Sequence, residues 1–364
     1  MADQGLTKDD LRAAVSAGSI TEAQAASVLA LSEARRGVRE NIDGLNEPFE
    51  LFKGFNEIFI VVGLGILFGG YTGVAALFGA ELAGPIVAMV TVWFLSRYFI
   101  RARRMVAPAI ALALMFSSSA GALGLAIANV FAPDPTIVTD VEEFLHYSVA
   151  YLPLSSSIAA LSMAAFWYVF RVPFALFLIS ISVFMAVFGF TSLGGAEFNG
   201  PEQIFLLTSQ GPFSVITIAL GFVALFVALR FDMSDPHRVT LNASNAFWLH
   251  VIAAPAIVNT VALTLFALGS NIALVGVFVF VLLMAIFAIA IDRRSFLISG
   301  VGYIVALAFT VIEGQAFTII MILGAVLVLL GAKWESWRGQ IMRTLPNFPG
   351  KDRLPPWDQQ KDTE

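Results

Sequence analysis

Residues 272–291 read IALVGVFVFVLLMAIFAIAI, a run of twenty residues without a charged, amide or hydroxyl side chain. An α-helix rises roughly 1.5 Å per residue, so such a run is long enough to cross the hydrocarbon core of a bilayer, which is about 30 Å thick. The run shows no alternation of polar and apolar residues, which favours a helix over a strand of a membrane barrel. We expect a membrane-spanning helix that faces lipid over much of its surface.

The remainder of the chain has the same character. It is 364 residues long, 58% apolar and only 13% charged, whereas water-soluble domains carry roughly 25% charged residues. This composition excludes a water-soluble multidomain protein. The sequence predicts an all-α, polytopic transmembrane helical bundle with ten spans, at 58–78, 82–100, 105–131, 149–170, 172–193, 210–229, 247–268, 272–291, 296–312 and 316–332.

The placement of positive charge predicts the topology. If the N-terminus is inside and the chain crosses ten times, all 21 Lys and Arg residues fall on the inner side. The charged residues of the outer connections are then all acidic, among them Glu81, Glu197 and Glu313. Lys and Arg are enriched in the cytoplasmic loops of membrane proteins. Both termini are therefore expected in the cytoplasm, and a bacterial cytoplasmic (inner) membrane is the simplest location.

The segments outside the spans predict smaller elements. Residues 1–46 read as a cytoplasmic helical hairpin, with Gly18 as a helix stop and Thr21 and Gln24 as a cap of the second helix. This hairpin can dock on the membrane domain, on a protein partner, or remain a solvated leader. Residues 47–57 predict an interfacial helix, and 58–332 the transmembrane domain. Residues 333–364 predict a polar, partly disordered tail, and 199–208 a short outer helix begun by Pro201.

The run Gly18-Ser19-Ile20-Thr21-Glu22-Ala23-Gln24-Ala25 carries a resemblance. It is similar to the N-terminal region of a group of uncharacterised bacterial multi-pass membrane proteins. In that group a G-x-I-T-x-x-Q-A helical hairpin precedes the first span. The similarity covers about forty residues and implies a bacterial membrane protein, without a role for any residue.

Several classes of function are disfavoured. The net charge of −5 and a pI near 5.3 argue against binding to nucleic acid, which needs a basic surface. The chain has no cysteine, so a disulfide framework or a thiolate site is excluded. No catalytic constellation is found, so we expect neither an enzyme nor a bound cofactor.

Two groups of residues have the donors of a metal site. Glu143 and His146 are three residues apart, which places them on one helical face, but a second copy of the motif is missing. An exposed ion pair explains them more simply. Asp232, Asp235 and His237 gather in the loop after the sixth span, where they could hold a hard cation or form an ordinary turn. The turn is the preferred interpretation, and no metal is expected.

The seventh span is the most polar of the ten, and it supplies the candidate substrate pathway: His250, Pro255 and Asn259. Pro255 removes a backbone hydrogen bond and predicts a kink. A broken helix beside a polar cavity is how many transporters build their sites. However, His250 and Asn259 lie about 180° apart on a regular helix, so without a kink they cannot both face one cavity. Helix packing is the alternative explanation of these residues.

Small residues mark two other spans. Gly65, Gly69 and Gly73 recur every four residues in the first span, and 117–121 with Gly124 forms a small face in the third. Such faces let helices approach closely. For the first span, packing within the chain is favoured over a dimer contact.

Two functions of different kinds follow. The first is a permease or carrier of a small, weakly charged or apolar solute. The second is a non-catalytic assembly or scaffold subunit that binds its partner through residues 1–46. No Asp, Glu, Lys or Arg lies near the centre of a predicted span, which weakens ion-coupled transport.

Overall fold

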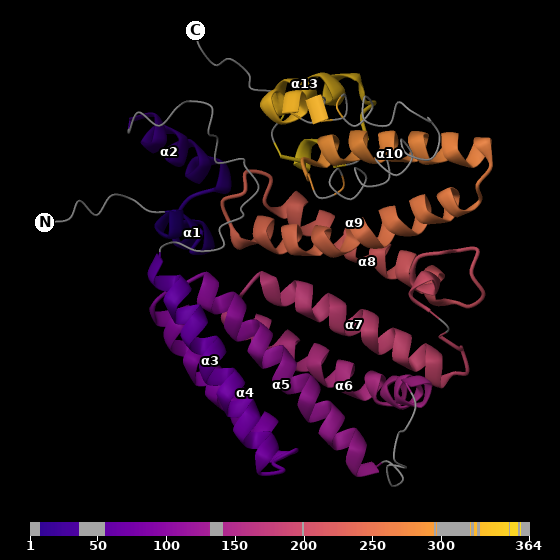
Figure 1. Ribbon diagram of the computed structural model, residues 1–364. Coiled ribbons are helices and arrows are strands. Elements are labelled where there is room, and N and C mark those ends of the chain that lie inside the picture. The colour runs from indigo at the N-terminus through magenta and orange to yellow at the C-terminus, as the bar shows by residue number, and fades with distance from the viewer. Residues whose placement is uncertain are drawn as a thin grey trace, which may run out of the picture. The chain divides into compact units, whose positions relative to one another are not determined.

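The computed structural model describes residues 8–35, 55–131, 141–198, 200–294, 296, 321, 324–325, 328–348, 350–355 and 357. All regular elements in these ranges are helical (Figure 1). Eight of the helices are long and apolar enough to cross a membrane. The chain is therefore consistent with a multi-pass integral membrane protein. Of the ninth predicted span the structure describes only residue 296, and of the tenth only residues 321, 324–325 and 328–332. The interfacial segment up to residue 54 and Glu313 lie outside the described residues.

The chain divides into two units, and each is described by itself. The second unit comprises residues 49–204 and 209–220. Its helices are α3 (Phe55–Leu77), α4 (Ala83–Ser96) with the π-helix η1 (Arg97–Ala102), α5 (Ala107–Phe131), α6 (Val141–Phe170), α7 (Phe174–Leu193) and the short 3₁₀ helix η2 (Pro201–Ile204). Their bounds agree with the first five predicted spans to within a few residues, except that α6 begins eight residues before its span. Helix η2 agrees with the short helix predicted after Pro201.

Helix α6 packs against both α5 and α7 in this unit (Figure 1). Small residues allow the close approach, because a Cβ atom built on Gly124 would stand 2.5 Å from the Cα atom of Ser155. One built on Gly189 would stand 2.6 Å from the ring of Pro153. The small face of the third span is therefore a packing surface, as predicted.

The glycines of α3 behave differently from the prediction. A Cβ atom on Gly65, Gly69 or Gly73 would meet no heavy atom within 4 Å in the described part of the chain. The close intramolecular packing favoured for the first span is thus not found there. Helix α3 instead leaves most of its surface exposed, as a helix surrounded by lipid does.

The first unit comprises residues 1–48, 205–208 and 221–364. Its described helices are α1 (Lys8–Ser16), α2 (Glu22–Arg35), the part of α8 (Phe213–Ser234) from Gly221 onward, α9 (Leu241–Ala267), α10 (Asn271–Ile291), α13 (Trp334–Thr344) and the 3₁₀ helix η3 (Lys351–Arg353). Helix α13 and η3 lie within the segment for which a polar, partly disordered tail was predicted.

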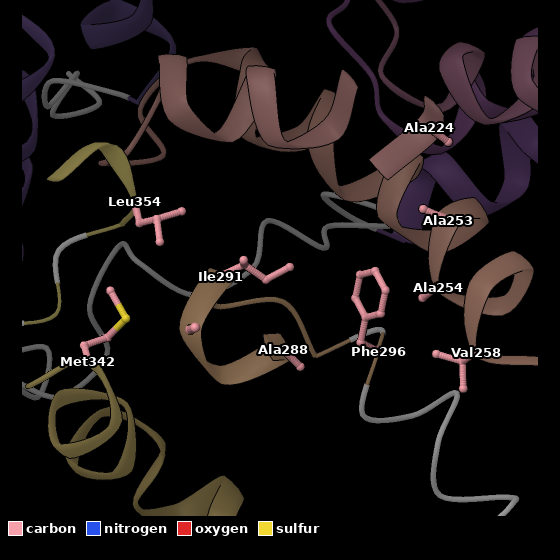
Figure 2. Close-up of a cluster of buried hydrophobic side chains, with 10 residues drawn as sticks. Ala224, Ala253, Ala254, Val258, Ala288, Ile291, Phe296, Met342 and Leu354 are labelled. Atoms are coloured by element: carbon pink, nitrogen blue, oxygen red, sulfur yellow. The ribbon is translucent and has the colours of Figure 1, made fainter. Parts of the chain in front are cut away.

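An apolar core joins these elements (Figure 2). It is built mainly from small side chains on α8, α9 and α10, to which Phe296, Met342 of α13 and Leu354 add bulk. Met342 is fully buried and Leu354 is 6% exposed. The C-terminal segment is thus packed on the ends of membrane-spanning helices, which brings its polar residues close to theirs.

The N-terminal hairpin forms as its sequence predicts. Gly18 lies in the turn just after α1 and has a φ of 71°, a left-handed conformation that glycine adopts without strain. The amide of Gln24 donates to the hydroxyl of Thr21 over 3.2 Å, and the side chain of Gln24 accepts from the amide of Thr21 over 2.8 Å. This reciprocal pair is a capping box.

Candidate functional site

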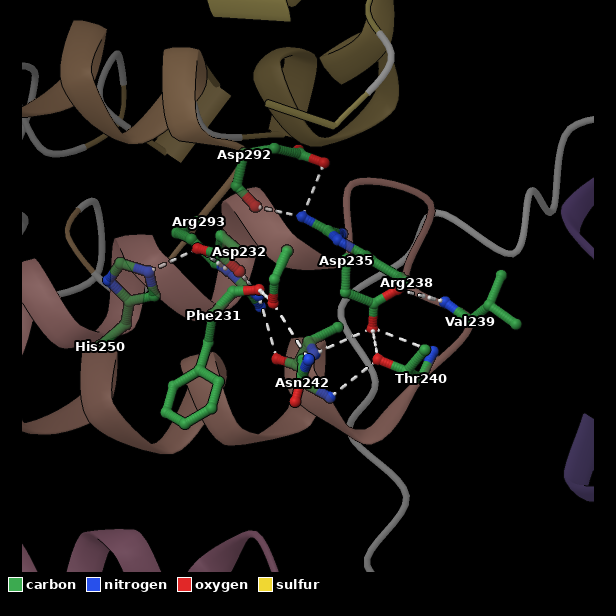
Figure 3. Close-up of polar contacts among 12 residues, drawn as sticks. Phe231, Asp232, Asp235, Arg238, Val239, Thr240, Asn242, His250, Asp292 and Arg293 are labelled. Atoms are coloured by element: carbon green, nitrogen blue, oxygen red, sulfur yellow. Dashed lines mark hydrogen bonds and ion pairs between the residues drawn. The ribbon is translucent and has the colours of Figure 1, made fainter. Parts of the chain in front are cut away.

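The α8–α9 turn is organised by Asp235. Its carboxylate accepts hydrogen bonds from the backbone amides of Val239, Thr240 and Ala243 over 2.9–3.1 Å, and from the Thr240 hydroxyl over 2.6 Å (Figure 3). The Thr240 hydroxyl in turn accepts from the amide of Asn242. A carboxylate and a hydroxyl at a helix N-terminus satisfy amides that the helix leaves free and complement its dipole. Asp235 is therefore a helix cap, in agreement with the turn interpretation.

Because of these hydrogen bonds, the helix of the seventh span begins earlier than predicted. Helix α9 begins at Leu241, six residues before the predicted boundary, because the polar stretch 242–245 is held by the cap. The sixth span also continues beyond its predicted end, to Ser234. As a result Asp232 belongs to the last turn of α8 and does not lie in a loop.

Asp232 is the centre of a buried ionic cluster (Figure 3). Its Oδ2 atom lies 2.7 Å from Nε2 of His250, and 3.3 Å from Nε of Arg293, which donates to it. The Nη2 atom of Arg293 donates to the Oδ1 atom of Asp232 and, over 3.0 Å, to the carbonyl of Ala243. We call Asp232, His250 and Arg293 the buried triad.

The burial of the triad is complete. His250 and Arg293 are fully buried, and Asp232 is 2% exposed. Removing a charge from water costs several kcal/mol, which an ion pair recovers only when its hydrogen bonds are well formed. The guanidinium contacts both oxygens of the carboxylate, which is the strongest arrangement of such a pair. The triad thus holds α8, α9 and the start of the segment after α10 in one register.

A second ionic group lies beside it, around Asp292. This residue ends α10 in a left-handed conformation, with a φ of 58°. Its carboxylate accepts from Arg238 over 2.9 Å and from the indole nitrogen of Trp334 over 2.5 Å, with Arg338 at 4.0 Å. Burial lowers the pKa of Arg338, and the negative charge of Asp292 partly offsets this effect. The group anchors α13 to the α8–α9 turn and to the end of α10.

The N-terminal hairpin contacts the same turn. The amide of His237 donates to the carboxylate of Glu22 over 2.7 Å, and Nε of Arg12 donates to the carbonyl of Val239 over 2.9 Å. Val239 also forms a small apolar cluster with Leu11 and Ala25. Desolvation, together with a side-chain hydrogen bond to the Asp235 carboxyl group, raises the pKa of Glu22 to about 7.

The predicted pathway residues are only partly brought together. His250 belongs to the buried triad, while Asn259 is half-buried further along α9 and has no side-chain hydrogen bond in the described part of the chain. Pro255 lies between them, inside a helix that continues through it. The Nδ1 atom of His250 is buried and meets no hydrogen-bond partner among the described residues. The pathway through these three residues stays a prediction.

The other candidate sites have weaker support than the buried triad. Within the described ranges, no three His, Asp or Glu side chains lie close enough to hold a metal ion. Glu143 and His146 lie where the side chains are outside the description. A pocket of about 410 Å³ is found in the second unit, at the α3–α4 turn beside Glu81 and Asn129. It is open and contains no residue of α9, so the buried triad remains the stronger candidate.

Sequence reasoning missed the partnership within the triad. Arg293 was expected on the inner side, between the eighth and ninth spans, and Asp232 in a turn, yet both are buried. The signal that could have found them is the pair of oppositely charged residues at the inner ends of the sixth and eighth spans, with His250 one turn inside the seventh.

Comparison with known proteins adds no further assignment. The chain matches no protein-family model, no curated protein and no solved structure at a significant level. The resemblance of the N-terminal hairpin to a group of bacterial membrane proteins therefore stays a prediction, and the function has to be argued from the site itself.

Proposed function

We propose that the chain is a carrier of a small, weakly charged or apolar solute, with its working site on α9 next to the buried triad. The single observation that carries this proposal is the complete burial of Asp232, His250 and Arg293 at the ends of membrane-spanning helices. Ionisable residues within membrane helices are costly, and they commonly mark the path of a substrate or proton.

The arrangement of α9 supports the same proposal. Pro255 lies five residues beyond His250, and a proline leaves one backbone carbonyl of its helix without a partner. In transporters, backbone groups that are freed within a membrane helix bind substrate. The Nδ1 atom of His250 and the amide of Asn259 are polar groups on this helix that other described residues leave available.

The topology of the proposal follows from the sequence. It includes ten spans, with both termini in the cytoplasm of a bacterium and the chain in the inner membrane. Its basis is the one-sided distribution of all 21 Lys and Arg residues. The eight described spans are consistent with a multi-pass membrane protein.

The experiment uses the full chain reconstituted in liposomes. Uptake is measured for a panel of radiolabelled neutral amino acids, sugars and nucleosides, at equal and at unequal pH across the membrane. We expect a solute that enters above the level of empty liposomes, and we expect Asn259→Leu to abolish its uptake. Asn271→Leu, at the exposed start of α10, is the matched control and is expected to transport normally.

Either of two results contradicts the carrier. One is the absence of uptake for the whole panel, and the other is uptake that Asn259→Leu leaves unchanged. Both variants are first checked by size-exclusion chromatography and thermal unfolding, so that loss of folding is not mistaken for loss of transport.

The second candidate is a scaffold subunit that binds a protein partner through residues 1–46. The observation that favours it is the small apolar contact of the hairpin with its own chain. Among the described residues, the buried members of this contact are Leu11, Ala25 and Val239. Three such side chains provide a modest docking energy, so another protein could displace them. The scaffold predicts no flux, together with loss of a co-purifying protein when residues 1–46 are deleted.

A further inference from the structure

Five exposed arginines gather at one end of the second unit. Two of them belong to η1, two to the turn that follows it, and one to the turn between α6 and α7. We call this set the arginine cluster: Arg97, Arg101, Arg103, Arg104 and Arg171.

Direct contacts bring the two segments together. The Nη2 atom of Arg101 donates to the carbonyl of Val169 over 2.8 Å, and its guanidinium lies 5.7 Å from the ring centre of Phe170. Val169 belongs to the last turn of α6, where carbonyl groups have no partner within the helix. Since Arg171 follows directly after this turn, its charge lies beside those of η1.

The arginines are held in place by aromatic side chains. Arg103 donates from Nε and Nη2 to the hydroxyl of Tyr98 over 3.2 and 3.1 Å. The guanidinium of Arg171 lies 4.9 Å from the ring centre of Trp167 and 5.1 Å from that of Tyr168. Such cation–π contacts restrict the side chains without neutralising them. The cluster is therefore partly preorganised for a negatively charged ligand.

The backbone of the cluster is strained at two positions. Arg104 and Arg171 have φ values of 51° and 54°, in the left-handed region. Side chains other than glycine, asparagine and aspartate seldom adopt this conformation, and glycine is the usual residue just after a helix. An arginine at both positions is the kind of local strain that proteins retain at binding sites.

Among the described residues, the positive charge of the cluster is not balanced by an acidic side chain. In the described part of the chain, none of the five arginines forms an ion pair with an acidic side chain. The acid of α3 at this end of the unit, Glu57, is 6% exposed and accepts hydrogen bonds from the backbone amides of Ala107 and Val106. Five neighbouring positive charges repel one another, so an anion in their midst is favourable.

The cluster also lies at the depth of lipid headgroups. The span Ala83–Ala102 carries Arg97 and Arg101 in its last six residues, and Arg103 and Arg104 follow it directly. Arg171 follows directly after the span Tyr151–Phe170. Tyr98 and Tyr168, which are 49% and 69% exposed, flank it. Tyrosine is enriched where a membrane protein crosses from hydrocarbon to headgroups.

We propose that the arginine cluster is a binding surface for the phosphate headgroup of an anionic phospholipid. A guanidinium donates two parallel hydrogen bonds to a phosphate, which a single ammonium group cannot do. The surrounding tyrosines contact the glycerol region and the upper part of the acyl chains. This inference does not depend on transport, because it concerns the second unit alone.

The test uses the full chain in mild detergent and native mass spectrometry. Phosphatidylglycerol and phosphatidylcholine with the same acyl chains are added in turn, and the fraction of lipid-bound protein is measured. We expect selective binding of phosphatidylglycerol. The variant Arg97→Gln with Arg104→Gln removes two charges whose side chains form no hydrogen bond or ion pair with the described residues. At about fivefold per arginine, its affinity should fall by about 25-fold.

The matched control replaces two exposed arginines of the first unit, Arg230→Gln with Arg353→Gln, and should bind phosphatidylglycerol like the unchanged chain. The thermal unfolding temperatures of both variants establish that they are folded. Equal binding of both lipids by the unchanged chain would overturn the proposal, as would equal losses in the two variants. Displacement of bound lipid by millimolar inorganic phosphate would also overturn it, in favour of a soluble anion.

Discussion

Replacing Glu22 by glutamine is expected to remove a pH dependence from the docking of the α1–α2 hairpin. Glu22 contacts the amide of His237 and shares a hydrogen bond with the carboxyl group of Asp235. When the two carboxyl groups share one proton, they form a hydrogen bond, whereas two ionised carboxylates repel each other. Three other charged or titratable groups surround it. The Nδ1 atom of His237 lies 3.5 Å from a carboxylate oxygen of Glu22, Arg12 of α1 donates to Val239, and Arg238 is paired with Asp292.

The sign and size of the effect follow from the pKa of Glu22, which docking raises from 4.5 to about 7. The docked hairpin binds the proton more tightly than the free hairpin does, so docking is strongest near and below pH 4.5. It weakens as the pH rises to about 7 and then stays constant. A shift of this size corresponds to at most about 3 kcal/mol. Because the Glu22 side chain is 20% exposed, solvent screening reduces this to about 1–2 kcal/mol.

The assay is hydrogen exchange of the α1–α2 amides, measured by mass spectrometry in detergent. The variant and the unchanged chain are compared at the same pH, which cancels the intrinsic pH dependence of exchange. Glutamine can donate to Asp235 and still accept from His237, at any pH. We therefore expect equal protection at pH 5, and at pH 8 a protection about 5- to 30-fold higher in Glu22→Gln.

The control is Glu81→Gln, an exposed acid of the second unit, which should not change hairpin exchange at either pH. A ratio of protection that stays the same from pH 5 to pH 8 would refute the reasoning. A variant that is less protected than the unchanged chain at pH 8 would refute it as well.

Two further predictions concern the buried ion pair of the triad and the close packing of α5 on α6. Asp232→Asn should destabilise the chain by about 3–5 kcal/mol, because it leaves the charge of Arg293 buried without its carboxylate; thermal unfolding in detergent measures this, and a loss below 1 kcal/mol would contradict it. Gly124→Ala should cost about 1–3 kcal/mol, since its Cβ atom would stand 2.5 Å from the Cα of Ser155. Gly69→Ala, which adds its Cβ to open space, should be neutral or stabilising in the same measurement, and equal effects of the two glycine variants would argue against the packing.

The sequence contained enough information to locate the described spans. Long apolar runs determine them, because a spanning helix has to satisfy its own backbone groups and present apolar side chains to lipid. Local signals were equally informative in the hairpin, where Gly18 and the pair Thr21 and Gln24 act through neighbours only three or four residues away. The predicted helix boundaries were wrong where polar residues extend a helix beyond its apolar run, as at Asp232 and at the start of α9.

The buried triad could not be predicted for a physical reason. An arginine after a span is solvated in most membrane proteins, and hydropathy cannot tell this from an arginine covered by another segment. Arg293 is buried because the C-terminal segment packs on the ends of the spans, with Trp334 bonded to Asp292. That contact joins residues 42 positions apart, so no local sequence pattern predicts it.

The most direct test of the proposed carrier needs no knowledge of its solute. The chain has no cysteine, so a single Asn259→Cys substitution can be labelled with a membrane-impermeant methanethiosulfonate reagent in vesicles of either orientation. A carrier whose site opens alternately to the two sides predicts labelling from both, with none at Ala254→Cys, a fully buried position of the same helix. If Asn259→Cys reacts from neither side, α9 is a packed core element and the carrier is contradicted.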